Sequence, residues 1–279
     1  MTTTLRPTGP LQQADDGTKS RSYEVCVNGR PAGAVEIATD PGFAHRAGIV
    51  RSLRIDGPDR RRGRATVAVL AAEEVLRGWG CDQSQALVPA DAEAALHLAE
   101  TLGYTERSRN MDKELLPGPA ALPEGVEGRP MTEAEYQAWR ARSVGDFARS
   151  WTDRGVPAEQ ALAKSEASHR ANLPQGLATP GVSFTVLVHE GAAVGHVWVA
   201  PREVRPGRPG SYVYDVEVAE EQRGKGYGRA LMLLAERVAL EAGPPLLGLH
   251  VFTTNTPALR LYTSLGYRTT QRNLVRPLL

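Results

Sequence analysis

The second half of the chain carries short runs in which apolar and polar positions alternate, separated by turns rich in glycine and proline. Such a pattern is typical of strands. It predicts a hairpin of two strands over residues 183–191 and 192–200, a loop over 201–210, and a strand over 212–218 in which most residues are β-branched or aromatic. A strand over 246–252 and a last strand at the end of the chain follow.

Two segments of this half have helical spacing instead. Residues 229–242 carry an apolar stripe and end at Gly243. Asn255 is a good N-cap for a second helix over 256–265. Residues 131–180, ahead of the hairpin, also show helical patterning. The alternation of strands and helices predicts an α/β fold.

The first half repeats this plan in a shorter form. Residues 22–29 and 32–40 predict a hairpin, and a strand over 49–55 and a helix over 65–78 follow. A strand over 84–88, a helix over 92–102 and a last strand complete the series. Only a short tail stands where the second half has residues 131–180.

A constant offset of 163 residues places 52–116 over 215–279 without a gap, and the shared residues include turns. Gly80 falls on Gly243, and the Leu-Gly-Tyr sequence that ends at Tyr104 falls on the one that ends at Tyr267. Unrelated helices share scattered alanines and leucines, but they rarely share glycines in register. The chain is therefore predicted to contain the same fold twice.

Composition divides the chain at a segment that cannot form a regular element. Residues 116–130 hold four prolines and three glycines and are typical of a linker. We therefore predict a disordered polar tail over 1–20, a first domain over 21–116, a linker over 117–128 and a second domain over 129–279, with the two domains packed on each other.

The charge balance narrows the class of protein. The formal net charge is +1, with 33 basic and 32 acidic residues, and this argues against a nucleic-acid or membrane-surface role. No apolar run has the length of a membrane span, and the N-terminus has no signal-peptide core. Cys26 and Cys81 show no metal spacing. A reduced, cytoplasmic enzyme without a metal is expected.

The candidate chemistry begins at a glycine-rich turn between a predicted strand and a helix. Gly226 and Gly228 would let the backbone approach a ligand closely, and the first N–H groups of a helix point outward without partners. Together they predict an anion site suited to a pyrophosphate. A tight turn with no ligand would look the same, and the spacing fits neither a dinucleotide-binding motif nor a P-loop.

A second motif, N-x-x-A-x-x-L-Y-x-x-L-G-Y, begins 29 residues after Gly226. With R-x-x-G-x-G at 223–228, it resembles the GCN5-related N-acetyltransferase (GNAT) superfamily over about 183–279. The resemblance implies two tandem GNAT-like domains, each with a mixed, mostly antiparallel central sheet flanked by helices. It also implies acetyl-CoA as co-substrate.

The same resemblance implies where acetyl-CoA binds in the second copy. The pantetheine arm would lie where two central strands separate, paired with the backbone of Val216 and Val218 and contacted by Asn255. The pyrophosphate would be held by backbone N–H groups of the turn, with two side chains as charge partners. These residues are Arg223, Gly224, Lys225, Gly226, Tyr227, Gly228 and Arg229.

The catalytic side chains are predicted partly from chemistry. Tyr262 matches the general acid of many family members, and a phenol with an ordinary pKa of ~10 can supply the proton that the leaving thiolate needs. The general base stays open between His250, on the strand beside the gap, and Glu217. Asp215 is expected to share the face of Glu217. His189 and His196, on the hairpin, are interpreted as structural.

The first copy keeps the phosphate motif but not the reactive side chains. Arg60, Gly63 and Ala65 preserve R-x-x-G-x-A and form a possible second CoA site. At the positions of His250, Asn255, Tyr262 and Glu217 stand Leu87, Ala92, Ala99 and Arg54. The first copy is therefore predicted to be a degenerate domain.

The predicted function is transfer of an acetyl group from acetyl-CoA to the amine of a small-molecule or peptide acceptor, by direct attack, in the second copy. Two alternatives stay open. One is acetylation of a cysteinyl amine, as in mycothiol synthase, which is also a two-copy acetyltransferase. The other is a CoA-binding sensor or scaffold without turnover.

Overall fold

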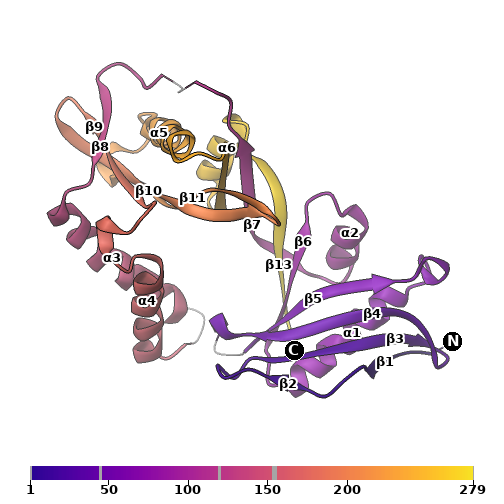
Figure 1. Ribbon diagram of the computed structural model, residues 1–279. Helices are drawn as coiled ribbons and strands as arrows, with labels where there is room; N and C mark the ends of the chain where they lie inside the picture. The colour runs from indigo at the N-terminus through magenta and orange to yellow at the C-terminus, as the bar shows by residue number, and fades with distance from the viewer. Residues whose placement is uncertain (1, 44–45, 119–120, 153–155, 279) are drawn as a thin grey trace. The chain divides into compact units, whose positions relative to one another are not determined.

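The computed structural model describes residues 2–43, 46–118, 121–152 and 156–278. Two compact units divide the chain, one formed by residues 1–109 together with 270–279, the other by residues 110–269. Both combine a mixed sheet with helices, as predicted (Figure 1). In the described residues, no helix is long and apolar enough to span a membrane.

The first unit has a sheet with the order β1-β3-β4-β5-β6-β13, and β2 pairs with β3. Helices α1 and α2 follow β5 and β6, as the pattern of the sequence predicts. A core of Val25, Val35, Ile37 and Leu76 joins the strands to α1. The elements are β1 (Thr3–Pro7), β2 (Gln12–Gln13), β3 (Lys19–Val27), β4 (Arg30–Asp40), β5 (Ala47–Ile55), α1 (Arg64–Gly78), β6 (Gln83–Pro89), α2 (Glu93–Thr101) and β13 (Arg268–Pro277).

The N-terminal segment differs from the disordered tail predicted over residues 1–20. Its strand β1 pairs antiparallel with β3, from Thr3 opposite Val27 to Pro7 opposite Tyr23. Leu5 packs against the core of the first unit, and Arg6 forms an ion pair with Glu24. One apolar side chain and an open sheet edge are thus enough to order a segment whose composition is that of a tail.

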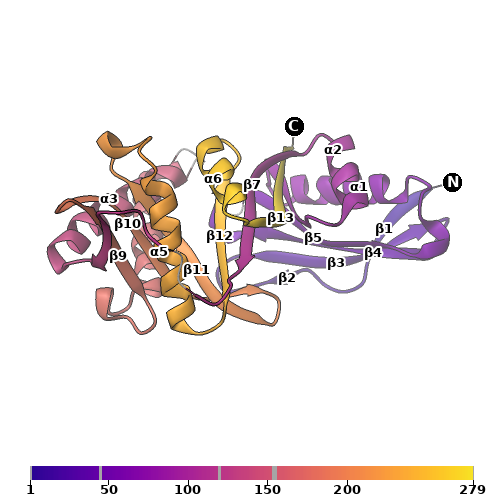
Figure 2. The ribbon, with the colours of Figure 1, turned by 90° about the horizontal axis from the view of Figure 1, so that it is seen from above.

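The second unit has the order β12-β11-β10-β9-β8, with α5 over one face of this sheet and α3, on which α4 packs, over the other (Figures 1 and 2). Helix α5 packs across β10 and β11 with a core that includes Leu231, Leu234 and Val197. Trp139 of α3 packs with Phe184 and Trp198 on the other face. The elements are β8 (Val126–Pro130), α3 (Glu133–Thr152), α4 (Ala158–Asn172), β9 (Ser183–His189), β10 (Ala192–Arg205), β11 (Arg208–Val218), α5 (Tyr227–Ala242), β12 (Leu246–Phe252) and α6 (Thr256–Ser264).

Two expectations for this unit differ from the structure. The loop predicted over 201–210 is mostly strand, because β10 continues to Arg205 and β11 starts at Arg208. The glycines and prolines of this segment lie at the end of the β10–β11 hairpin, where they remove few hydrogen bonds between the strands. The linker predicted over 117–128 ends in strand β8, whose Val126 pairs opposite His189. A proline-rich segment can still supply an edge strand.

The central strands of the second unit pair over a short stretch only. β11 and β12 run parallel from Ser211 opposite Leu247 to Val213 opposite Leu249, and both strands continue past that pair. β5 and β6 of the first unit part at the equivalent place, after Val50 opposite Ala86. Each unit therefore has a gap between its central strands, as the resemblance implied.

Each unit also contains a strand from the other copy of the repeat. β13, at the end of the chain, pairs with β6 of the first unit, where Arg276 binds the fully buried Glu73 at 2.8 Å. β7 (Thr105–Glu114) ends the first copy, and its second half lies in the second unit, where Lys113 binds Glu236 at 2.7 Å.

These two ion pairs are equivalent under the offset of 163 residues. Met111 and Leu115, on either side of Lys113, are buried in the core of the second unit. A boundary at 116 and 129 would therefore divide this core. A repeat in the sequence shows that two copies exist, but it cannot show which copy receives each last strand.

Candidate active site

The turn that precedes α5 has the geometry of an anion site. Gly224 and Gly226 have φ angles of 79° and 87°, in the left-handed region that only glycine adopts readily. Gly226 is the N-cap of α5, so the backbone N–H groups that follow lie at the positive end of the helix dipole. A Cβ atom on Gly228 would lie 3.2 Å from Leu261. Gly228 is thus also needed where α5 and α6 approach each other.

The side chains of this turn make contacts of their own. Lys225 binds Gln222 at 2.9 Å and Arg229 binds Ser264 at 2.7 Å, and all four residues lie near the surface. The Tyr227 hydroxyl lies 2.6 Å from Nδ1 of His189, so its ring turns toward β9. Tyr227 would therefore offer a ligand its backbone N–H rather than its hydroxyl.

The gap between β11 and β12 begins where the register of β11 is irregular. A register shift between Trp198 and Val199 of β10 leaves Tyr214 as an extra residue in β11. Val216 and Val218, past this bulge, pack on the core that contains α5. Glu217 therefore projects to the opposite face, as strand alternation predicts. Bulges often re-aim side chains at functional sites.

Tyr262 lies on α6 with its ring buried, 6.0 Å from the ring of Tyr267. Burial, and then the negative charge of Asp215, raise the pKa of Tyr262 to about 12. Its hydroxyl therefore keeps its proton at neutral pH and can give that proton to a stronger base formed beside it. The charge interaction also places Asp215 within electrostatic reach of Tyr262.

Asp215 is the centre of a polar cluster on the face of the sheet that α3 covers. Its Oδ2 atom accepts hydrogen bonds from Nε1 of Trp139 at 2.8 Å and from Nε2 of His196 at 3.0 Å. Burial alone would raise the pKa of Asp215, but these hydrogen bonds and the imidazole outweigh it and lower that pKa. Glu217 Oε2 lies 3.9 Å from the same Nε2 atom, and its side chain is 49% exposed. Two carboxylates thus share one imidazole.

His250 lies on β12, on the other side of the gap. It is exposed, and its ring meets that of Phe252 edge-on at 5.0 Å. Leu249 and Val251 point the other way, into the core with α5. His250 is therefore exposed, on the strand beside the gap.

Asn255 has the local role predicted for it. Its side-chain oxygen accepts the N–H of Ala258 at 3.2 Å and caps α6. The oxygen is engaged, so a pantetheine contact would fall to the amide nitrogen.

Sequence reasoning missed three side chains of this site. His196 was interpreted as structural, and Trp139 and Asp215 were given no role. A signal existed, because His196 pairs directly opposite Glu217. It could not be used, because a loop was expected over 201–210 and the register of a hairpin depends on where its turn lies.

The first unit keeps the backbone of the site without its reactive side chains. Arg61 and Gly63 have φ angles of 58° and 71°, equivalent to those of Gly224 and Gly226. Nε of Arg60 bonds to the carbonyl of Ile55 at 2.7 Å, and Nε of Arg223 bonds to that of Val218 at 3.4 Å. The turn is thus a structural feature of both copies.

In the first unit, the positions equivalent to Tyr262 and Asn255 carry alanines. Ala99, at the position of Tyr262, is buried with Val88 and Tyr104. Ala92 packs against the same cluster, and Ala65 packs against the core that contains α1.

Neither cysteine belongs to the second unit. Cys26 and Cys81 are both buried in the first unit, and burial raises the pKa of Cys81 to about 11. A thiol with so high a pKa is a poor nucleophile at neutral pH. Among the residues that the structure describes, no cluster of histidine, cysteine and carboxylate side chains could hold a metal ion.

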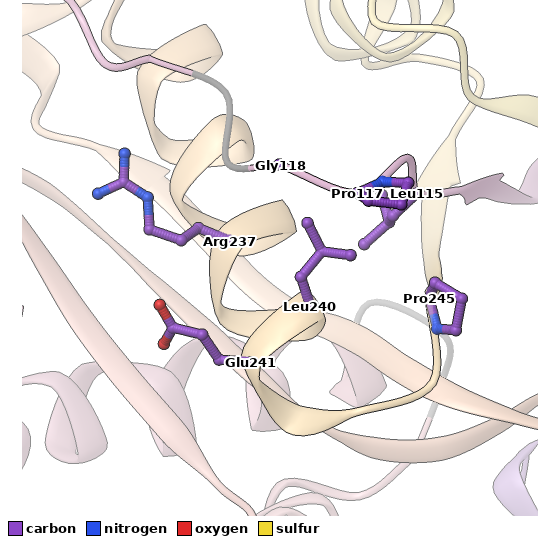
Figure 3. Close-up of a pocket in the computed structure, with 7 residues that line it drawn as sticks. All are labelled: Leu115, Pro117, Gly118, Arg237, Leu240, Glu241 and Pro245. Carbon is purple, nitrogen blue, oxygen red and sulfur yellow. The ribbon is translucent and has the colours of Figure 1, made fainter.

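A pocket of about 460 Å³ lies at the far end of α5 (Figure 3). Leu240 faces Leu115, Pro117 and Pro245 there. From Gly228 to Leu240 the helix rises by roughly 18 Å. The pocket is therefore remote from the gap and from Tyr262.

Comparison with known proteins places these features in a family. Residues 3–104 and 139–267 match the model of the acetyltransferase (GNAT) family. A mycothiol acetyltransferase of Streptomyces griseus is 31% identical over 269 residues, which cover 91% of this chain and 79% of the relative. An uncharacterized N-acetyltransferase of Bacillus subtilis, YdgE, is 33% identical over 148 residues, covering 50% of this chain and 90% of that protein.

Solved structures share the fold. A GCN5-related N-acetyltransferase from Sphaerobacter thermophilus superposes with a TM-score of 0.57 at 19% identity, over 92% of this chain and 80% of that one. A tandem GNAT protein from the clavulanic acid biosynthesis pathway gives a TM-score of 0.52 at 20% identity, over 96% and 85%. The tandem arrangement is thus found in solved structures.

Proposed function

Since the chain belongs to the acetyltransferase (GNAT) family, we propose that it transfers an acetyl group from acetyl-CoA to the amine of a small-molecule or peptide acceptor, with the chemistry in the second unit. The observation that carries this proposal is the difference between the two gaps. Both lie beside a turn of the same backbone conformation, but only the second is bordered by Tyr262, Asp215 and Glu217.

The residues around the second gap suit acetyl-CoA. The N–H groups of residues 224–229 would hold the pyrophosphate, because they lie at a helix N-terminus, with Arg223 and Lys225 as exposed cations beside it. The backbone of Val216 and Val218 would pair with the pantetheine arm, and Asn255 would contact it from α6. Acetyl-CoA supplies an acyl group on a thiol, a leaving group that needs one proton.

Tyr262 is the group that we assign to supply that proton. Its phenol is buried and stays protonated at neutral pH. Because burial disfavours charged groups, a neutral proton donor suits this place better than a charged one. The acceptor's amine must lose a proton before it attacks. Glu217 faces the gap from the side that α3 covers, within the cluster of Asp215 and His196, and this favours it over His250 as the base.

The choice of base has a direct test. Glu217→Gln should lower kcat/KM about 10²-fold and remove the acidic limb of its pH profile, because the carboxylate is lost with little change in size. His250→Ala removes only an exposed ring, so kcat/KM should stay close to the wild-type value. The reverse result would move the assignment to His250.

The first unit takes a structural part in this proposal. It keeps the turn at Arg60, Gly63 and Ala65, so it can still hold CoA there, but Leu87, Ala92 and Ala99 stand at the positions of His250, Asn255 and Tyr262. The first copy of the repeat also supplies the second half of β7, which belongs to the catalytic unit and its core.

Similarity favours one acceptor over others. Mycothiol acetyltransferases match this chain across both units, at 28% identity over 287 residues for the protein of Saccharomonospora viridis, 97% of this chain and 87% of that one. A cysteinyl amine is therefore the first acceptor to try. A CoA-binding sensor without turnover is the remaining alternative.

The test compares two matched variants in the full chain. Gly226→Val and Gly63→Val introduce the same side chain at a left-handed N-cap with open space around it, so both carry similar backbone strain. We expect Gly226→Val to abolish acceptor-dependent thiol release and weaken acetyl-CoA binding in calorimetry, while Gly63→Val stays near wild type. Equal loss in two folded variants would refute the division between units, and a wild type that never releases thiol with any amine would favour the sensor.

A further inference from the structure

The polar cluster beside the second gap contains a histidine, His196, to which the proposed reaction assigns no role. His196 lies on β10 with its side chain 10% exposed, directly opposite Glu217 in the strand register. Its Nε2 atom is 3.0 Å from Oδ2 of Asp215 and 3.9 Å from Oε2 of Glu217. One nitrogen therefore faces both carboxylates.

The hydrogen bonds define where the protons are. An indole N–H only donates, so Trp139 donates one hydrogen bond to Oδ2 of Asp215. An ionised carboxylate only accepts, and the lowered pKa of Asp215 keeps it ionised at neutral pH, so the bond from His196 is donated by Nε2–H. His196 thus carries a proton on the nitrogen that lies between the two acids.

The charges around the imidazole come from one strand. In the part of the chain that the structure describes, the carboxylates within 4 Å of it are those of Asp215 and Glu217, both on β11. Val186 pairs with it from β9, and from α3 the cluster receives the uncharged indole of Trp139. Tyr262 reaches the cluster through the field of Asp215. Two negative groups on one face repel each other, and the Nε2–H dipole lies where it offsets that repulsion.

The proposed reaction needs a proton acceptor that is ionised when the acceptor molecule binds. An acceptor that arrives as an ammonium gives up two N–H protons as its nitrogen bonds to the acyl carbon and the carbon–sulfur bond breaks. One proton ends on the leaving sulfur through Tyr262, and the other goes to solvent. Glu217, whose side chain is half exposed, can take that second proton and release it to water.

We propose that His196 is a positioning residue for this step: held by its hydrogen bond to Asp215, it places the positive end of the Nε2–H dipole 3.9 Å from Glu217 and so orients that carboxylate to take the acceptor's proton. Trp139 donates to the same Oδ2 atom of Asp215, so α3, a part of the segment 131–180 that the first copy lacks, supports the carboxylate pair. The inference rests on the proposed N-acetyltransferase function.

A double-mutant cycle on kcat/KM tests the proposal in the full chain, with the amine that gives most thiol release as acceptor. His196→Gln keeps a hydrogen-bond donor, and His196→Phe removes it. We expect roughly tenfold and 10²-fold losses in kcat, with KM for acetyl-CoA within about twofold of wild type. In both His196 variants, the acidic limb of the pH profile of kcat/KM should move to higher pH. In a Glu217→Gln background, His196→Gln should add nothing.

His189→Gln is the control. Like His196, His189 is a histidine of the hairpin with a side-chain hydrogen bond, in its case to Tyr227, but it lies away from the carboxylates. Nitrogen-15 NMR of the histidines gives a readout that needs no turnover, with the His196 signals assigned by their loss in His196→Gln. The Nε2–H tautomer is expected at neutral pH.

Three outcomes overturn the inference. A His196→Phe variant that folds and keeps the wild-type pH profile would do so, as would losses that multiply in the double variant, or an Nδ1–H tautomer at His196. If the wild type is active and the two fold-losses multiply in the double variant, the proposed function stands and the role of His196 does not. A wild type without acceptor-dependent thiol release would remove both.

Discussion

Arg276→Met is expected to destabilise the first unit, although Arg276 lies at the other end of the chain. Arg276 binds Glu73 at 2.8 Å, and Glu73 is fully buried on α1. The substitution keeps an apolar stem but leaves a buried carboxylate with the Tyr104 hydroxyl, at 2.8 Å, as its remaining hydrogen-bond partner. Breaking a buried pair in this way typically costs about 3–5 kcal/mol.

The magnitude lies near the lower end of that range, because Arg276 keeps 27% of its side-chain surface exposed and water can reach the pair. A loss of about 3 kcal/mol would lower Tm by about 10 °C for a domain of this size. Urea denaturation measures the free energy of unfolding, and hydrogen exchange on peptides from β6 and β13 locates the loss.

Two further variants complete the experiment. Arg51→Met removes an arginine from the same unit whose partner Glu36 is also exposed, at 3.2 Å, so its cost should stay below about 1 kcal/mol. Glu73→Leu combined with Arg276→Met removes both charges and should recover most of the stability. If Arg276→Met costs no more than Arg51→Met, the exchanged strand does not carry the stability inferred for it.

Three other predictions follow from the structure. Tyr262→Phe keeps the ring and removes the proton, so kcat should fall about 10²–10⁴-fold, and a kcat within threefold of wild type would exclude the assigned role. The fragment 129–279 lacks β7, so its circular dichroism and solubility should be those of an unfolded or aggregated chain, and a stable, active fragment would contradict this. The lowered pKa of Asp215 means that its ionised form stabilises the fold above the unfolded pKa of ~3.9 and that this contribution disappears as pH falls through the folded value. The stability difference between wild type and Asp215→Asn should thus be constant above about pH 5 and decrease as pH falls below the unfolded pKa and through the lowered folded pKa of Asp215.

Local patterns in the sequence were enough for most of the fold. The alternation over 212–218 and the stripe over 229–242 correspond to β11 and α5, and the glycine-rich turn lies between this strand and this helix, as predicted. The N-cap at Asn255 was also predicted. Each of these depends on residues a few positions apart.

Features that depend on distant residues could not be predicted in the same way. The bond from His196 to Asp215 requires the position of the turn between β10 and β11 and a bulge at Tyr214. The contact of Trp139 joins residues 76 positions apart. No local pattern specifies such a pairing, because the same alternation is compatible with several registers.

If the chemistry lies in the second unit, as proposed, the exchange of last strands gives a physical reason for the chain to retain the first copy. If each copy were complete, loss of the reactive side chains in the first would leave nothing to preserve it. Here the core of the second unit includes Met111 and Leu115, and Glu236 of α5 is paired with Lys113, all from the strand that ends the first copy. The helix that begins at the phosphate turn therefore packs against sequence from the degenerate copy. Substitutions at Ala92 or Ala99 leave that support intact, whereas loss of β7 would disturb α5 itself. On this reasoning the first copy can lose its catalytic residues freely but cannot lose its last strand.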